Sequence, residues 1–151
     1  MAAEDLTLFE RLRIQMEALV PVIRAFEAEF GGDAVKAVLE ARLQNDLDEA
    51  TATTPPQADL RVMTAGTEAY AAGDVLDYEV LTVSEDRFEM NVTRCGYAAL
   101  MEELDARDLG PLLICNHDFP MALRMGAELE RTQTCMRGAS HCDFRYRRRS
   151  G

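Results

Sequence analysis

The chain lacks any long apolar run, although 48% of its 151 residues are hydrophobic. No stretch approaches the roughly 20 consecutive apolar residues that span a bilayer, so we expect no membrane-spanning helix. The first residues, MAAEDLTLFERL, are acidic and have no apolar centre, which is unlike a signal peptide. These absences predict a cytoplasmic protein with no membrane partner.

Positive charge is also scarce, because 16 Lys and Arg residues stand against 27 Asp and Glu, giving a net charge of -11. Nucleic-acid binding depends on neutralising phosphates, so we expect no nucleic-acid partner. An anionic small molecule would be repelled at long range, and a site for one would need local arginines. The charge therefore directs attention to individual arginines rather than to a basic surface.

The four cysteines, Cys95, Cys115, Cys135 and Cys142, include no C-x-x-C pair. The compact zinc and thioredoxin motifs are therefore absent. In a reducing cytoplasm these residues should be free thiols. We predict no cofactor, and a bound metal remains an alternative because three cysteines and two histidines could in principle meet.

The first half of the chain has helical periodicity. Apolar residues at helical spacing predict helices over residues 5–30, 33–49 and about 58–72. Pro21 is expected to kink or split the first helix, and Asp33 is expected to cap the second.

The second half begins with a change of period. Alternation over 77–84 and 87–95, around a Ser84-Glu85-Asp86 turn, predicts a β-hairpin. Helices are expected in CGYAALMEELDAR and in GPLLICNHDF, where Pro111 suits a first turn and Pro120 should interrupt the helix.

AELERTQTCM and HCDFRYRR form a second predicted hairpin, joined by RGAS, which would place Cys135 opposite Cys142. The whole pattern predicts one α+β domain over residues 1–151. Its helical N-terminal layer, at about 5–72, packs on an antiparallel sheet built from two β-hairpins separated by helices. The sheet and the helices that carry the site lie at about 77–148.

Three positions favour chemistry. Cys95 follows Arg94 and stands between a strand and a helix, where the helix N-terminus and the arginine would both lower the thiol pKa. Cys115 and Asp118 would share one face of a helix, and a carboxylate there needs a partner or a site. A small buried cysteine is the alternative for Cys95.

The last hairpin offers a further thiol and an arginine. Strand alternation turns Asp143 away from Cys142, which we interpret as a pocket wall or second thiol packed by Phe144 and Tyr146. Arg131 shares the face of Cys142, so it must be paired or line a pocket, unless it extends from the sheet edge to solvent.

Three motifs in order, NVTRCGYAAL, GPLLICNHDF and LERTQTCMRGASHCDFRY, resemble the L-2-amino-thiazoline-4-carboxylic acid hydrolase family of bacterial proteins. The resemblance spans about residues 77–147, and the helical N-terminal half matches in general character. It places these residues at characteristic positions of the family: Cys95, Cys115, Asp118, Arg131, Thr132, Gly138, Cys142, Asp143 and Phe144.

The family's named activity is ring opening of 2-amino-thiazoline-4-carboxylate to N-carbamoyl-cysteine. The resemblance therefore implies a hydrolase that acts on the carbon–nitrogen bonds of a cyclic amidine or thioimidate, by attack at the C=N carbon. A homo-oligomer is left open.

We assign roles by chemical argument. Cys95 is the predicted nucleophile, and Asp118 or Asp143 would hold the amidinium and move protons. Arg131 would bind the substrate carboxylate bidentately. Cys115 and Cys142 are further predicted catalytic thiols; the other predicted substrate contacts are Thr132, Phe144, and Asn91 and Thr93, placed on the Cys95 side of their strand.

A different class of function fits the same pattern. A helical layer on an antiparallel sheet with clustered cysteines also resembles the 4-vinyl reductase type of ligand-binding module. The alternative is therefore a non-catalytic domain that binds or senses a small molecule. Recovery of the ligand unchanged would favour it.

Overall fold

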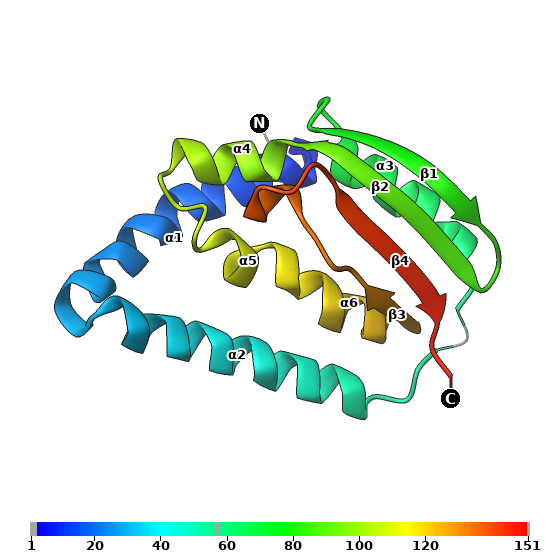
Figure 1. Ribbon diagram of the computed structural model, residues 1–151, viewed down its shortest axis with the longest axis horizontal. Helices are drawn as coiled ribbons and strands as arrows, with labels where there is room; N and C mark the ends of the chain where they lie inside the picture. The colour runs from blue at the N-terminus through cyan, green and yellow to red at the C-terminus, as the bar shows by residue number, and fades with distance from the viewer. Residues whose placement is uncertain (1–2, 57, 151) are drawn as a thin grey trace.

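A computed structural model describes residues 3–56 and 58–150, in which helices pack on one face of a four-stranded sheet (Figure 1). The helices are α1 (Leu8–Phe30), α2 (Gly32–Ala52), α3 (Met63–Ala71), α4 (Gly96–Glu103), α5 (Gly110–Leu113) and α6 (Asp118–Arg124). Short 3-10 helices are η1 (Ala3–Asp5), η2 (Leu60–Val62), η3 (Cys115–His117) and η4 (Cys135–Arg137). The strands are β1 (Leu76–Val83), β2 (Arg87–Cys95), β3 (Ala127–Glu130) and β4 (Cys142–Arg148).

Helix α1 begins with a reciprocal cap. The Thr7 hydroxyl accepts from the Glu10 N–H, and the Glu10 carboxylate accepts from the Thr7 N–H. Pro21 lies inside α1 without splitting it. Buried side chains on both sides of the proline, Val20 and Ile23 among them, hold the helix in the core.

Helix α2 begins earlier than predicted. Gly31 adopts a positive φ of 89° between the two helices, and α2 starts at Gly32 rather than after an Asp33 cap. A residue with a side chain would be strained at this φ, so glycine suits the sharp turn. Figure 1 shows α1 and α2 diverging from this turn, with α2 running alongside α5 and α6.

The sheet has the order β1-β2-β4-β3, and every neighbouring pair is antiparallel. The predicted α+β class and antiparallel sheet are therefore confirmed. Its inner face carries Phe88, Met90, Val92, Cys142 and Tyr146 against η2, α3 and α6. Its outer face carries charged side chains of β2, β3 and β4, including Arg87, Glu89, Glu130, Arg145 and Arg147.

The second hairpin differs from the prediction. Strand β3 ends at Glu130, which lies opposite Arg145, whereas the predicted pairing of Cys135 with Cys142 would have placed Glu130 opposite Arg147. The register is shifted by two residues, so the predicted faces are retained but Cys135 does not pair with Cys142 as a strand residue. Residues 131–134 leave the sheet because the Asp143 carboxylate accepts the backbone N–H groups of Thr132 and Gln133.

The segment 110–124 also differs. The helix is interrupted at Ile114, whose φ of -127° and ψ of -71° are not helical, and not at Pro120. Pro120 lies in the first turn of α6, where a missing N–H leaves no helical bond unmade. The break turns η3 and α6 so that Cys115 and Asp118 face the sheet side of this segment, toward β2 and Arg131.

Two hydrophobic clusters form the core. One joins α1 and α4 through residues such as Met16 and Leu100, and the other joins the inner sheet face to η2 and α6. Cys95 and Cys135 pack against both clusters. These two thiols therefore lie where the halves of the core meet.

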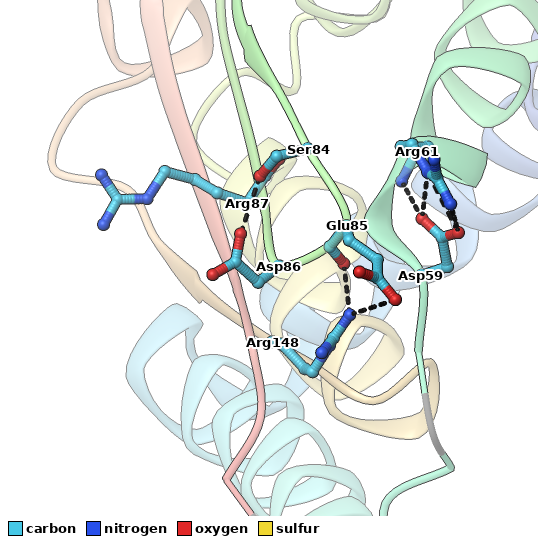
Figure 2. A network of polar contacts seen from close by, with 7 residues as sticks. All are labelled: Asp59, Arg61, Ser84, Glu85, Asp86, Arg87 and Arg148. Carbon is cyan, nitrogen blue, oxygen red and sulfur yellow. Dashed lines mark hydrogen bonds and ion pairs between the residues drawn. The ribbon is translucent and has the colours of Figure 1, made fainter.

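The turn between β1 and β2 is tied to the end of β4, as Figure 2 shows. Arg148 donates to the Glu85 carbonyl at 2.9 Å and pairs with its carboxylate at 3.5 Å. Within the turn, the Ser84 hydroxyl donates to Asp86 at 2.8 Å. The network fixes the far end of the sheet, opposite the end that carries Cys95 and Cys142.

None of the helices described in residues 3–56 and 58–150 combines the length and the apolar character needed to cross a membrane.

Candidate functional site

A buried ion pair lies at the centre of the site. Arg131 Nη1 donates to Asp118 Oδ2 at 2.6 Å, and its Nη2 donates to the Cys115 carbonyl at 2.9 Å. The Arg131 side chain is 3% exposed and that of Asp118 is 23% exposed. Arg131 is therefore buried and paired, which is one of the two predicted alternatives, and it does not extend from the sheet edge to solvent.

Two aromatic rings enclose the same guanidinium. Its carbon lies 5.1 Å from the Phe119 ring centroid and 5.0 Å from that of Phe144. Cation–π contacts such as these two are stronger in a desolvated setting. The predicted role of Arg131 as anchor for a substrate carboxylate does not fit, because Asp118 already occupies that position.

Asp118 is the proton-active group of this pair. Burial raises its pKa above the ordinary carboxyl value, while the charge and hydrogen bond of Arg131 oppose the shift. The nearby His117 also opposes this rise in the Asp118 pKa. A ring nitrogen of His117 lies 3.0 Å from the Leu112 carbonyl oxygen. A carboxyl whose pKa is raised by burial holds a proton more readily than an exposed one, which suits a group that accepts and returns protons.

Cys95 is the N-cap of α4, as the sequence predicted. The backbone N–H groups of Tyr97 and Ala98, in the first turn of α4, favour the thiolate and lower the pKa, but burial is the larger effect and raises the thiol pKa. The predicted low pKa is wrong. The helix contribution exists, but Arg94 turns away to pair with Asp77 at 2.8 Å.

A β-bulge at Thr93 explains this orientation. Tyr78 lies opposite Val92 and Asp77 lies opposite Arg94, which leaves Thr93 as the extra residue. Thr93 and Arg94 are consecutively exposed, and the side chain that follows turns inward. Cys95 thus joins the inner face by an exception to alternation.

Asn91 and Thr93 therefore do not share the Cys95 face, and that prediction is wrong. Asn91 lies opposite Asp143, and its side-chain oxygen accepts from Arg145 Nη2 at 2.9 Å on the outer face. The Thr93 side chain is exposed and lies 3.4 Å from the Asp77 carbonyl.

The other thiols gather around Cys95. Cys115 interacts electrostatically with Cys95, Asp118 and Arg131, and burial raises its pKa to about 12. Cys142 lies on the inner face and accepts from the Cys135 N–H at 3.2 Å, and burial raises its pKa to about 12. Cys95 and Cys115 thus interact with Asp118, and Cys142 joins this group through Cys95 and Cys135.

Sequence reasoning missed three members of this group. The Cys135 thiol donates to the Val92 carbonyl at 3.4 Å, close to Cys142. The Tyr97 hydroxyl donates to the Tyr70 carbonyl at 2.9 Å and interacts electrostatically with Cys95 and Asp118. Phe119 directly follows Asp118 in the sequence. An aromatic residue beside a charge in an apolar segment could have indicated a cation–π contact, which the structure has with Arg131.

Asp143 and Thr132 occupy a different place. The Asp143 carboxylate accepts from the Thr132 N–H at 2.9 Å and from its hydroxyl at 2.5 Å, on the outer sheet face. Burial raises the Asp143 pKa, but the hydrogen bonds from Thr132 and Gln133 lower it overall. These contacts brace the loop before η4, and a substrate role for either residue stays a prediction.

In the part of the chain that the structure describes, no three His, Cys, Asp or Glu side chains are placed so that they could hold a metal ion. The four cysteines found there are all free thiols. The group can therefore supply thiols, a proton-active carboxyl and a buried cation.

Comparison with known proteins gives a family match and distant structural likenesses. The family model described as L-2-amino-thiazoline-4-carboxylic acid hydrolase matches residues 11–146. No curated protein matches the sequence. Among solved structures, the phenol-responsive sensory domain of the transcription activator PoxR with phenol is similar, with 11% identity and a TM-score of 0.40 over 87% of this chain and 73% of that chain.

Proposed function

Because the chain belongs to the L-2-amino-thiazoline-4-carboxylic acid hydrolase family, we propose that it hydrolyses a small cyclic amidine or thioimidate. The substrate would be 2-amino-thiazoline-4-carboxylate or a close analogue, and the product a carbamoyl amino acid. The supporting observation is the buried Asp118–Arg131 pair, with Cys95 and Cys115 in electrostatic contact with the same carboxylate. These contacts support a scheme in which Cys95 is the nucleophile and Asp118 carries the proton.

Asp118 compensates for the raised pKa of Cys95. A buried neutral thiol is a weak nucleophile, so it needs a base at the moment of attack. Asp118 can take the thiol proton, and Arg131 keeps that carboxylate in position. The Tyr97 and Ala98 N–H groups would stabilise the sulfur as its charge develops.

The proposed reaction has two steps. In the first, the Cys95 thiol gives its proton to Asp118, and its sulfur bonds to the amidine carbon. The bond from that carbon to the ring sulfur breaks, and Asp118 returns the proton so that the ring sulfur leaves as the substrate's own thiol. An amidino group then remains on Cys95.

Water resolves this intermediate in the second step. Its oxygen bonds to the same carbon and becomes the carbonyl oxygen, while the bond to Cys95 breaks and the sulfur regains a proton. One water is consumed and both substrate nitrogens remain in the product, one as the NH2 of the carbamoyl group and the other as the amino-acid nitrogen that carries this group. No redox partner or resident cofactor is required by this scheme.

The remaining parts of the proposal follow from chemistry and charge. The partner is a small molecule that carries a carboxylate, and neither nucleic acid nor membrane is invoked. We place the protein in the cytoplasm, where its thiols stay reduced. Arg131 becomes a positioning residue for Asp118, and Cys115 and Cys142 become thiols that shape the site around Cys95.

Turnover tests this function directly. Purified protein is incubated with 2-amino-thiazoline-4-carboxylate, and N-carbamoyl-cysteine is followed by mass spectrometry. Asp118→Asn should lower kcat by about 10²- to 10⁴-fold, as expected for loss of a general acid–base. Asp86→Asn makes the same change in the remote β1–β2 turn and should retain the full rate.

Two results would contradict parts of the proposal. Full turnover in Cys95→Ser would exclude the thiol step while leaving a water-attack hydrolase. Binding of the substrate with complete recovery of unchanged ligand would instead favour the non-catalytic binding domain. Elemental analysis of protein purified without added metal tests the metal-dependent alternative.

A further inference from the structure

A concavity lies beside the thiol site. A cleft of about 770 Å³ opens between α2 and the segment that runs from α5 to α6. Its walls include Leu43, Leu112, Asn116, Phe119 and Arg137. This volume is in the range of small-molecule sites, and the mixture of apolar walls with a few polar groups is typical of them.

Most charges in this cleft are already paired. Lys36 lies 3.6 Å from Glu40 on the same helix. Asp108 accepts from Arg24 at 2.7 Å. Arg107 donates to the carbonyls of Cys135 and Met136 and pairs with Glu102 at 3.1 Å.

Arg137 is different. Within residues 3–56 and 58–150, its guanidinium makes no hydrogen bond and no ion pair. Its backbone is nevertheless fixed, because its N–H donates to the Thr134 hydroxyl at 3.2 Å and to the Thr134 carbonyl at 3.1 Å. A rigid backbone thus presents an unpaired fork of donors to the cleft, which is the geometry that carboxylates prefer.

The cleft is connected to the thiol site by two contacts. Arg137 interacts electrostatically with the Cys115 thiol. Phe119 is a lining residue of the cleft, and its ring centroid lies 5.1 Å from the guanidinium carbon of Arg131. Phe119 is therefore shared between the wall of the cleft and the surroundings of the Asp118–Arg131 pair.

We infer that this cleft binds the carboxylate of the substrate and that Arg137 is its anchor. The inference rests on the proposed function, since it identifies how that substrate is held. It assigns opposite tasks to two arginines in one motif. Arg131 forms a buried ion pair with Asp118, whereas the Arg137 guanidinium can bind an anion that enters from solvent.

The test is a double-mutant cycle between the protein and its ligand. Binding is measured by calorimetry with an unreactive five-membered cyclic carboxylate, 2-oxothiazolidine-4-carboxylate, and with its carboxamide. Arg137→Gln should weaken binding of the carboxylate by about 10- to 100-fold, the range for loss of a charge-assisted bidentate contact. Binding of the carboxamide should change by less than about threefold, because no carboxylate remains for Arg137 to contact.

Lys36→Gln is the matched control, because it removes a cation from the same cleft that Glu40 already pairs. It should weaken carboxylate binding by less than about threefold. Equal binding of the carboxylate by wild type and Arg137→Gln would overturn the inference, as would equal losses for the two ligands. Failure of wild type to bind either ligand would also count against it.

This measurement does not depend on turnover. If the wild-type protein binds the carboxylate through Arg137 but produces no N-carbamoyl-cysteine, the anchor holds and the hydrolase proposal fails. If it turns over the thiazoline acid and Arg137→Gln leaves KM unchanged, the hydrolase proposal holds and the anchor fails. Arg137 is exposed, so the variant is expected to fold.

Discussion

At the scale of single residues, Arg131 has the most demanding position in the molecule. Its charge is almost wholly removed from water, and it is stabilised by a carboxylate, a carbonyl and two aromatic faces. Such a pair contributes little net stability compared with an apolar pair of the same shape. Loss of one partner, however, leaves an uncompensated buried charge.

We expect Asp118→Asn to lower the free energy of unfolding by about 3–5 kcal/mol, because Arg131 would remain charged and unpaired. The double variant Asp118→Asn with Arg131→Met should recover part of this loss, since the buried charge is then removed as well. Urea unfolding at neutral pH measures both. If the two substitutions instead lower the free energy of unfolding additively, Asp118 and Arg131 do not stabilise each other and the prediction is wrong.

Individual residues show what the sequence could predict. Cys95, Cys115, Asp118 and Arg131 were identified because a charge or thiol beside apolar residues needs a physical reason, and the structure brings all four together. Their protonation could not be predicted, because burial depends on both core clusters at once. The thiol pKa of Cys95 was therefore predicted to be lowered, whereas burial raises it.

At the scale of elements, the junction between β2 and α4 fixes the orientation of the thiol. Gly96 N–H donates to the Val75 carbonyl at 2.6 Å. A Cβ at Gly96 would lie 2.8 Å from that same oxygen, closer than side-chain carbons approach backbone atoms. The glycine is needed for this close contact between chain segments, and it sets where α4 begins.

Gly96→Ala should therefore lower the free energy of unfolding by about 1–3 kcal/mol, the usual cost of overpacking. Gly66→Ala is the control, because a Cβ there would meet no atom within 4 Å inside α3. Alanine favours a helix interior over glycine by about 0.5–1 kcal/mol, so the control should be neutral or stabilising. Thermal unfolding of both variants distinguishes the contact from a general effect of added side chains.

Element types were predictable where periodicity was long. The first hairpin and the α1, α2 and α4 helices follow from apolar spacing, with ends displaced by a few residues. Two features could not be predicted, because they depend on segments that are distant in the sequence. The bulge at Thr93 depends on pairing with β1, and the shortened β3 depends on a carboxylate from β4 that takes backbone N–H groups away from the sheet.

At the scale of the whole molecule, the buried thiols make the free energy of unfolding depend on pH in the alkaline range. Cys115 and Cys142 have pKa values raised to about 12 in the folded state. A thiol in an unfolded chain ionises at about 8.5. Between these values the unfolded state releases protons that the folded state retains, so stability is complete below about pH 8.5 and falls as pH rises.

Each of these two thiols should remove about 1.4 kcal/mol of stability per pH unit in that window. Urea unfolding at pH 8, 9 and 10 gives the slope for wild type. Cys115→Ala should have a shallower slope whatever its absolute stability, because one titrating group is absent. A slope identical to that of wild type would show that Cys115 is not shielded from ionisation.

The strand order has a consequence for the time course of folding. Neighbours β2 and β4 are separated in sequence by residues 96–141, so their pairing requires closure of a long loop, and such contacts form more slowly than a local hairpin. Cys95 and Cys142 stand at the two ends of that loop. During refolding, these sulfurs should become inaccessible to an alkylating reagent when β2 and β4 pair. The rate at which the thiols are protected therefore measures the rate at which the sheet closes.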